Sequence, residues 1–290
     1  MILAAGLGTR LKPLTDTMPK ALVPVGGKPL LDLNIRKLQS QGYNRFVVNV
    51  HHFAQQIIDH IAAHYPQDSP FTSQPLSLTT NSSPLTPKIL ISDETEQLLE
   101  TGGGLKKAQD LFRDGEPILI HNVDILDNVD YDWFASQHLP DEDAVLLVSR
   151  RKTKRYLLFD NAMRLMGWMN IETGEVKSPF QWLREAELTI DEDLSVHAQP
   201  NSQFSTLKSQ FSISTPTLRA FAFSGIHSFS PHLFPLMERF PDRFPIIDFY
   251  LSVCHRSHIV GLLKDDLKVL DVGKLDSLEQ AEQFIGNLNY

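Results

Sequence analysis

The sequence predicts an α/β fold with three layers, in which helices cover both faces of a mixed, mostly parallel central sheet. Strand and helix patterns alternate along much of the chain, and strands separated by helices favour parallel pairing. The length of 290 residues suits one large domain of this class. The composition, with 42% hydrophobic and 21% charged residues, is typical of a globular protein. We therefore expect a single domain that spans residues 1–290.

The first half of the chain carries the clearest alternation. Apolar residues recur at helical spacing in 29–41, and Gly42 is a typical helix stop. Residues 66–87 are rich in Pro, Ser and Thr, which predicts a long loop. The expected strands are residues 1–5, 46–50, 88–91, 117–121 and 144–149, and the expected helices are residues 29–41, 51–64 and 101–112.

The pattern changes after residue 150. Residues 156–160 and 164–170 predict a hairpin, and residues 172–216 predict a long irregular insert. No hexapeptide repeat follows residue 275, so we expect no C-terminal β-helix. The remaining expected elements are a strand at 221–228, a helix at 246–254, a strand at 259–263, a short apolar run at 269–273 and a helix at 277–288.

Charge and composition exclude several classes of partner. The net charge of −8 comes without an evident basic face, which argues against nucleic acid. No run of about 18 apolar residues is present, so we expect no membrane partner. Met1 leads directly into an apolar run, without the basic region of a signal peptide. Cys254 is the single cysteine and has no internal disulfide partner, so we expect a cytoplasmic protein.

The most informative stretch of the sequence is residues 3–30. A short apolar run is followed by Gly6 and Gly8, and glycines let backbone N–H groups approach an anion closely. Arg10, Lys12 and Lys20 add cationic donors beside this loop. Several donors at one place suit a polyphosphate, whose oxygens need many partners at once. The spacing matches neither the Walker A motif nor the dinucleotide fingerprint.

The order G-x-G-T-R-L-x-P-L-T, then P-K-x-L-x-P-V, then K-P resembles the signature of the sugar-nucleotide pyrophosphorylases. E-T-G-G-G and F-S-G-I are similar to segments of the N-acetylmuramate 1-phosphate uridylyltransferases and mannose 1-phosphate guanylyltransferases. The resemblance implies a Rossmann-like α/β/α nucleotide-diphospho-sugar transferase fold. It also implies transfer between a nucleoside triphosphate, UTP or GTP, and an amino-sugar or hexose 1-phosphate, giving NDP-sugar and pyrophosphate.

The resemblance implies a nucleotide-binding half at 1–125 and a sugar-binding half at 126–290. From their charge and position in the first half, we expect Arg10 to stabilise the leaving pyrophosphate and Lys20 to contact the α-phosphate and the sugar phosphate. Both are therefore the candidate catalytic residues. The candidate nucleotide-binding residues near the start of the chain are Leu3, Ala4, Ala5, Gly6, Gly8, Thr9, Arg10 and Lys20.

A second glycine cluster follows Leu99 and resembles the segment with which the family binds the nucleotide base. Glu100, Thr101 and Gly102 are the candidate base contacts there, although such a cluster can also be a loop that caps a helix. Asn122 is a further candidate nucleotide contact, at the end of an expected central strand. Ligands bind at the carboxyl ends of strands in open α/β sheets.

Asp124 and Asp271 are the candidate metal ligands. Mg²⁺ prefers one or two carboxylates together with phosphate oxygens and water. Asp124 follows the expected strand at 117–121, where it could also make a local turn. Asp271 lies in L-D-V-G-K, which resembles the family motif that supplies its second metal aspartate. The resemblance therefore implies a Mg²⁺ cofactor.

Two residues are candidates for binding the sugar phosphate. Gly225 resembles the glycine with which the family lines its sugar pocket, although a lone glycine in a strand can also mark a bulge. Arg155 is the favoured basic residue, in a charge run that could equally be a solvated face. Lys152, Lys154 and Lys177 are alternatives.

Two other functions fit the same sequence. One is transfer of CMP to an acceptor such as phosphocholine, for which Trp168, Phe180 and Trp182 could supply an aromatic cage. The other is a non-catalytic module that senses nucleotides. The joint presence of Arg10 and Lys20 with both aspartates favours catalysis. The sequence predicts neither the base, nor the sugar, nor the oligomeric state.

Overall fold

The computed structural model describes residues 1–66, 86–200 and 217–288. The chain divides into two compact units. Unit 1 comprises Met1–Arg113, Ile120–Trp133 and Lys268–Tyr290, and unit 2 comprises Asp114–Leu119 and Phe134–Leu267. The end of the chain thus packs with the first unit, and not with the second half to which the sequence assigned it.

Unit 1 is built on a parallel sheet, as the sequence predicted. Its order is β6 (Ile118–Asn122), β1 (Ile2–Leu3), β4 (Arg45–Val50) and β5 (Lys88–Asp93). All three pairings are parallel. Leu3 lies opposite both Asn49 and Asn122, so the carboxyl ends of β1, β4 and β6 meet at one edge. The first strand is therefore shorter than the expected one at residues 1–5.

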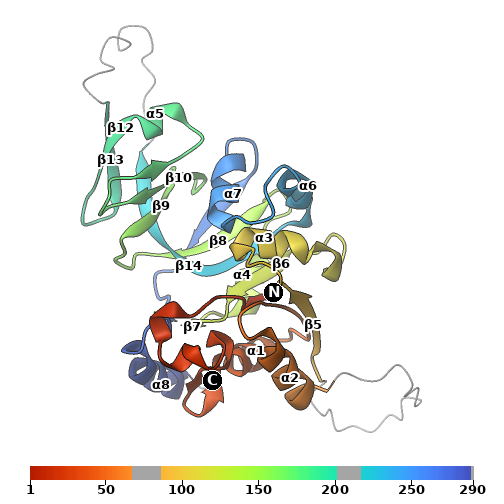
Figure 1. The fold of residues 1–290 in the computed structure, drawn as a ribbon. Coiled ribbons are helices and arrows are strands. Elements are labelled where there is room, and N and C mark those ends of the chain that lie inside the picture. The colour runs from red at the N-terminus through yellow and green to blue at the C-terminus, as the bar shows by residue number, and fades with distance from the viewer. Residues whose placement is uncertain (67–85, 201–216, 289–290) are drawn as a thin grey trace. The chain divides into compact units, whose positions relative to one another are not determined.

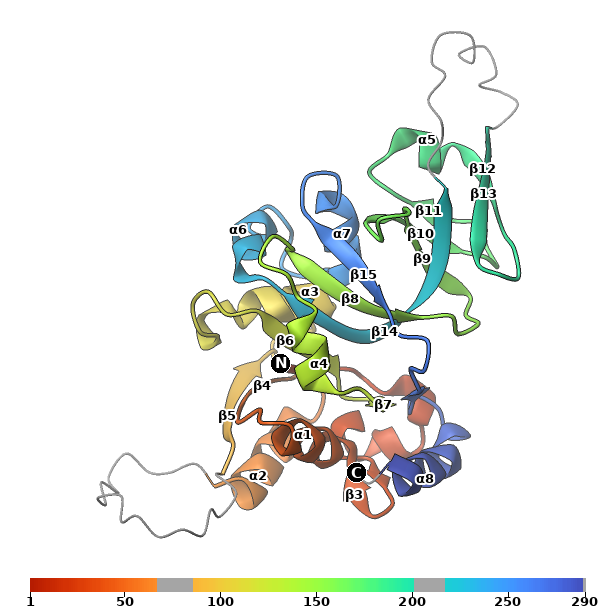
Figure 2. The same cartoon turned by 180° about the vertical axis from the view of Figure 1, so that it is seen from behind.

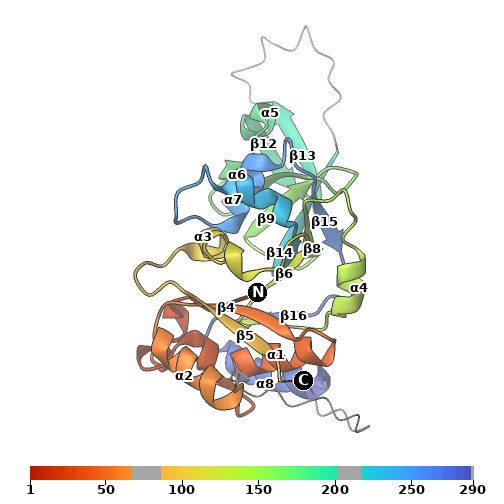
Figure 3. The same ribbon diagram turned by 90° about the vertical axis from the view of Figure 1, so that its right-hand side faces the viewer.

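Helices cover both faces of this sheet. Helices α1 (Leu30–Ser40) and α2 (Ala54–His64) lie on one side and α3 (Glu100–Lys107) on the other (Figures 1 and 3). Gly42 ends α1 with a φ of 87°, and the amide of Tyr43 bonds to Leu38 O at 3.1 Å. This arrangement is a Schellman cap, so the predicted helix stop is confirmed.

The C-terminal residues complete unit 1 through a two-stranded ribbon. Strand β16 (Val269–Asp271) pairs antiparallel with β7 (Ile125–Asp127), and α8 (Ser277–Leu288) follows it. The other short elements of this part of the chain are β2 (Pro24–Val25), β3 (Lys28–Pro29), α4 (Tyr131–Ser136) and the 3₁₀ turns η1 (Thr9–Leu11), η2 (Leu14–Asp16), η3 (Lys20–Leu22) and η4 (Gln109–Leu111).

Unit 2 contains a second set of strands, mainly antiparallel. The predicted hairpin is confirmed as β9 (Arg155–Phe159) and β10 (Leu165–Asn170). Strand β14 (Leu218–Phe229) pairs with β9 and with β8 (Ala144–Ser149). Strand β15 (Ile259–Leu263) is parallel to β8 (Figure 2). The remaining elements of the unit are β11 (Val176–Lys177), α5 (Gln181–Arg184), β12 (Ala186–Ile190), β13 (Ser195–Pro200), η6 (Pro231–Leu233), α6 (Phe234–Met237) and α7 (Ile246–Val253).

The expected irregular insert is wrong over residues 176–200, which form β11, α5, β12 and β13. Strands β12 and β13 pair antiparallel, and β12 alternates only between half-buried and exposed residues. Apolar Ala186, Leu188 and Ile190 nevertheless alternate with polar Glu187 and Thr189, which is the pattern of a strand, so β12 could have been predicted from the sequence. Residues 201–216, and most of the loop expected at 66–87, lie outside the described residues.

Each unit has its own apolar core. In unit 1 it lies between the parallel sheet and α1 and α2, where Ile2, Val48, Leu31 and Ile57 are completely buried. In unit 2 aromatic side chains dominate, with Phe229, Phe249 and Tyr250 buried together. Within the parts of the chain that the structure describes, no helix combines the length and apolarity that crossing a membrane requires.

Candidate functional site

The glycine-rich loop leaves β1 at the edge where the parallel strands end. Gly8 adopts a φ of 64°, a left-handed conformation that favours glycine. A Cβ at this position would lie 2.8 Å from Cγ2 of Thr15 and 3.1 Å from Cβ of Lys20. The hydroxyl of Thr15 donates to Gly8 O at 2.8 Å. Glycine is therefore required here both by conformation and by the close approach of Thr15 and Lys20.

The backbone amides of this loop differ in what they bind. The amide of Ala4 donates to Oδ1 of Asn49 at 2.7 Å, so it is already engaged. Within the described residues, the amides of Ala5, Gly6 and Leu7 donate to no other group. Three consecutive unbonded N–H groups at the end of a strand form an arrangement that can bind an anion.

Two ion pairs flank the loop. Nζ of Lys20 contacts Oδ2 of Asp124, and both side chains are largely buried, at 11% and 17% exposure. Nη2 of Arg10 lies 3.8 Å from Oδ2 of Asp271, and these two side chains are half exposed. The structure thus brings together the two candidate catalytic cations and the two candidate metal ligands, from three segments of the sequence.

The β7–β16 ribbon holds the backbones of Asp124 and Asp271 close to each other. Asp271 lies opposite Ile125 in the ribbon, and the amide of Val272 donates to the carbonyl of Asp124 at 2.8 Å. A Cβ on Gly273 would lie 2.5 Å from Oδ1 of Asp271, so glycine is needed beside the carboxylate. Carboxylates from two neighbouring backbone segments beside a glycine-rich loop are ligands of the kind that Mg²⁺ prefers. No group of three or more His, Cys, Asp or Glu side chains forms a metal site in the described part of the chain.

The second glycine cluster belongs to α3 itself and does not form a loop ahead of it. Helix α3 begins at Glu100, which has a φ of 61°, so Thr101 and Gly102 lie in its first turn. A non-glycine residue with positive φ is strained, and such strain is common at binding sites. Gly104 has a different role, because a Cβ there would lie 2.5 Å from Oε1 of the buried Glu94.

Asn122 and Val123 connect β6 to Asp124. The amide of Val123 donates to Leu3 O at 3.1 Å, and its carbonyl accepts from Nδ2 of Asn34 at 2.8 Å. The side chain of Val123 is only 3% exposed, so it packs in the interior. These bonds fix the turn that carries Asn122 and Asp124 to the end of β1.

A buried polar cluster around Asp127 stabilises the ribbon, and no sequence pattern indicated it. Asp127 is fully buried and accepts from Tyr131 OH at 2.8 Å, from the amide of Val129 at 2.7 Å, and from Nε2 of His121 at 3.1 Å. Lys37 Nζ forms an ion pair with the same carboxylate. Burial alone would raise the pKa of Asp127, but His121 and Lys37 outweigh it and lower the pKa to about 2.

The two candidates for the sugar phosphate belong to unit 2, whereas all the others belong to unit 1. Gly225 in β14 has a φ of 83° and lies within a register shift between Phe223 and His227, so it marks a β-bulge. Arg155 is exposed at the start of β9. The structure gives neither residue a partner that identifies a ligand.

The alternative basic residues of unit 2 have better defined surroundings. Nζ of Lys177 lies 3.1 Å from Oδ1 of Asp248 and 5.4 Å from the ring centre of Trp168. Lys154 pairs with exposed Glu172. Among the described residues, Trp168 makes no ring contact with Phe180 or Trp182, so the structure does not assemble the aromatic cage that these three could supply.

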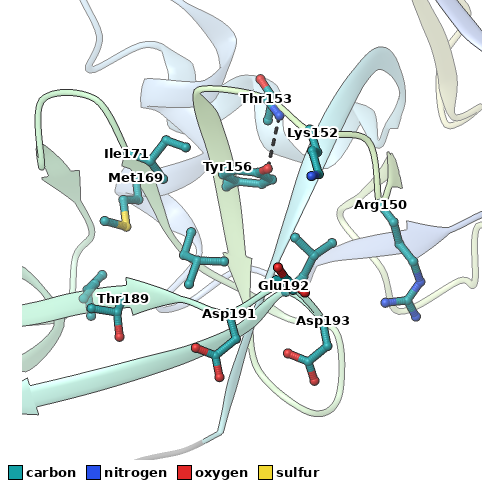
Figure 4. A pocket seen from close by; sticks show the side chains of 13 residues that line it. Arg150, Lys152, Thr153, Tyr156, Met169, Ile171, Thr189, Asp191, Glu192 and Asp193 are labelled. Carbon is teal, nitrogen blue, oxygen red and sulfur yellow. Dashed lines mark hydrogen bonds between the residues drawn. The ribbon is translucent and has the colours of Figure 1, made fainter.

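A cavity of about 730 Å³ in unit 2 contains Lys152 but not Arg155 (Figure 4). Its buried side includes Tyr156, whose hydroxyl accepts from the amide of Thr153 at 3.1 Å. Asp191 and Asp193 lie across the opening from Lys152 (Figure 4). The lining residues are Arg150, Lys152, Thr153, Tyr156, Met169, Ile171, Leu188, Thr189, Ile190, Asp191, Glu192, Asp193 and Leu194.

Known relatives match part of the chain in sequence. An N-acetylmuramate alpha-1-phosphate uridylyltransferase of Caulobacter vibrioides is 43% identical over 124 residues, which are 43% of this chain and 44% of the relative. The enzyme of the same name from Neisseria meningitidis serogroup B is 35% identical over 131 residues, 45% of this chain and 48% of the relative. The matches thus span less than half the length of each of these two relatives.

Solved structures resemble the whole chain in fold. The inositol-1-phosphate CTP transferase from T. maritima has a TM-score of 0.65 at 13% identity, and the match covers 99% of this chain and 94% of that one. This likeness confirms the predicted fold. The sequence profile of a family described as nucleotidyl transferase matches residues 1–156, more than half of the chain. The chain therefore belongs to the nucleotidyl transferase family.

Proposed function

We propose that the protein joins a nucleoside triphosphate and a sugar 1-phosphate, with Mg²⁺, to give an NDP-sugar and pyrophosphate. The observation that carries the proposal is the meeting of the Lys20–Asp124 and Arg10–Asp271 pairs at the end of β1. They lie beside a loop whose amides at Ala5, Gly6 and Leu7 are unbonded within the described residues. Family membership supports the same chemistry.

The chemistry follows from charge. The attacking oxygen of a sugar phosphate is already anionic, so no general base is needed. The difficulty is to hold two polyanions in line while charge builds on the α-phosphate and the leaving pyrophosphate. The loop amides would bind the triphosphate, Arg10 would stabilise the leaving group, and Lys20 would contact both the α-phosphate and the incoming phosphate.

The carboxylates of Asp124 and Asp271 would hold Mg²⁺. A bound Mg²⁺ would supply neutralising charge at the phosphate oxygens. In each ion pair, the cation that contacts the carboxylate is also the one that would bind a phosphate group of the substrate. Lys20 and Arg10 can therefore exchange a carboxylate for a phosphate oxygen without leaving the site.

The identity of the substrates is part of the proposal. The names of the Caulobacter and Neisseria relatives support UTP and the 1-phosphate of an acetylated amino sugar as the first pair to test. GTP with a hexose 1-phosphate is the second pair. The cytidylyl alternative has the support of a CTP transferase of the same fold.

Pyrophosphate release tests the proposal. The purified protein is assayed with Mg²⁺, and UTP, GTP, CTP and dTTP are each combined with a panel of sugar 1-phosphates and phosphocholine. Release from one combination would identify the reaction and both substrates. Release only with CTP and phosphocholine would show that the protein transfers CMP to phosphocholine and does not make a sugar nucleotide. No release from folded protein that binds a nucleotide would refute transfer to these acceptors and would favour the sensing module or an acceptor outside the panel.

A further inference from the structure

A carboxylate and an amide are buried together beneath the glycine-rich loop. Glu94, which follows β5, is completely buried, and Asn49 in β4 is 2% exposed. Nδ2 of Asn49 donates to Oε1 of Glu94 at 2.7 Å. Neither residue touches the ion pairs of the candidate site. A buried charge is costly, so its presence requires a reason.

Each member of the pair reaches a different binding segment. Asn49 Oδ1 accepts the amide of Ala4, in the loop expected to bind phosphate, at 2.7 Å. Glu94 Oε2 accepts the amide of Leu99, the residue before the segment expected to bind the base, at 3.1 Å. The pair therefore forms a continuous hydrogen-bonded chain from Ala4 to Leu99. Side chains of one residue in β4 and of the residue after β5 thus link the two segments.

Helix α3 packs closely against Glu94 and Asn49 through Gly104. A Cβ on Gly104 would lie 2.5 Å from Oε1 of Glu94 and 2.9 Å from Nδ2 of Asn49. The last glycine of the E-T-G-G-G segment is thus needed for close packing against the pair. The position of α3, and so of Glu100 and Thr101 in its first turn, depends on Glu94.

A carboxylate suits this position better than any neutral side chain. Both of its oxygens accept a hydrogen bond, one from Asn49 and one from Leu99. A glutamine has the same shape but only one acceptor, so one of the two donors would lose its partner. Burial raises the pKa of Glu94, against these two hydrogen bonds. The molecule thus retains a costly group that satisfies two donors.

We propose that Glu94 and Asn49 are positioning residues that fix the phosphate loop relative to the base-binding segment. They act through Ala4 and Leu99 and touch no substrate. Their effect is on a ligand that spans both segments, an intact nucleoside triphosphate, and not on a ligand that occupies the phosphate loop alone. The inference rests on the proposed function in identifying the two segments with phosphate and base.

The test compares two ligands by calorimetry, inorganic tripolyphosphate and the tightest-binding nucleotide of UTP, GTP, CTP and dTTP. Both are measured with Mg²⁺ and without sugar phosphate. The measured quantity is the ratio of the two affinities, which reports the contribution of the base segment. We expect E94Q to lower this ratio about tenfold, a typical effect of one buried donor left unpaired. The affinity for tripolyphosphate should change less than about threefold, because only a ligand that contacts both segments is weakened when they are misaligned relative to each other.

Two further variants complete the design. Glu96 is exposed in the same turn, so E96Q is the matched control and should leave the ratio unchanged. Gly104→Ala displaces Glu94 from the other side and should lower the ratio as E94Q does, which keeps the test decisive if E94Q does not fold. An unchanged ratio in the folded variants, or a wild-type protein that binds no nucleotide more tightly than tripolyphosphate, would overturn the proposal. Nucleotide binding without turnover would refute only the proposed function.

Discussion

Replacing Asp127 by Asn removes a charge on which the β7–β16 ribbon depends. Asp127 is fully buried and accepts hydrogen bonds from His121 and Tyr131, and its ion pair with Lys37 ties β7 to α1. Across the ribbon it lies opposite Val269. The substitution keeps the size of the side chain and removes one acceptor and the charge. We expect the variant to be less stable at neutral pH, with a loss that shrinks in acid.

The pKa of Asp127 gives the magnitude. Burial acts to raise it, but the hydrogen bond and charge of His121 and the charge of Lys37 lower it from 3.8 to about 2. Burial lowers the pKa of Lys37 although the charge of Asp127 acts to raise it. His121 therefore contributes more than Lys37 to stabilising the charged form of Asp127. A carboxyl whose folded pKa is depressed stabilises the fold fully above its unfolded pKa and loses this as the pH falls through the folded value. The contribution is about 2 kcal/mol at pH 7, of which about half remains at pH 3.

The assay is urea unfolding of wild type and D127N at pH 7, 5, 4 and 3. The difference in unfolding free energy should be at least about 2 kcal/mol and constant from pH 7 to 5, and then fall by about 1 kcal/mol by pH 3. Asp59 is exposed on α2, so D59N is the control and should be within about 0.5 kcal/mol of wild type throughout. A difference between wild type and D127N that stays constant down to pH 3, or grows in acid, would refute the reasoning.

Three further predictions concern the site. Lys20→Ala and Asp271→Ala should each lower turnover by at least about 10²–10³ with the fold intact by circular dichroism, because each removes a preorganised charge, and near-normal turnover would exclude that residue from catalysis. Lys177→Met should raise the KM for the sugar phosphate about tenfold, and Arg155→Met should raise it less than about threefold. The reason is that Asp248 orders the Lys177 side chain, whereas Arg155 is exposed. A larger effect of Arg155→Met than of Lys177→Met in initial-rate assays would favour Arg155. Gly8→Ala should weaken tripolyphosphate binding at least about tenfold in calorimetry, since a Cβ would meet Thr15 at 2.8 Å, and unchanged binding would contradict the proposed phosphate loop.

The sequence predicted those parts of the site that are contiguous. The strand, turn and cations of residues 3–30 follow one another along the chain, so their spacing alone indicated a phosphate loop. The structure places Lys20 against Asp124 and Arg10 against Asp271, so the four candidates chosen from sequence meet in space. Their roles in catalysis and metal binding stay predictions.

The parts that could not be predicted depend on contacts between distant residues. Asn49 and Glu94 lie 45 residues apart and meet because β4 and β5 pair in parallel register. In the sequence, Glu94 is one of several polar residues in a turn, with nothing to distinguish it from exposed Glu96. Gly104 likewise belongs to a run that suggested base recognition, whereas its neighbours show that it permits close packing.

The β7–β16 ribbon makes the order of synthesis matter. The glycine-rich loop is synthesised before Asp124, and Asp271 and the strand that holds it are synthesised after both. A nascent or prematurely released chain that stops before Val269 carries one carboxylate of the pair and an unpaired β7. Pairing of β16 with β7 can therefore form only after all the residues between them have been synthesised, and this pairing brings the second candidate carboxylate into place.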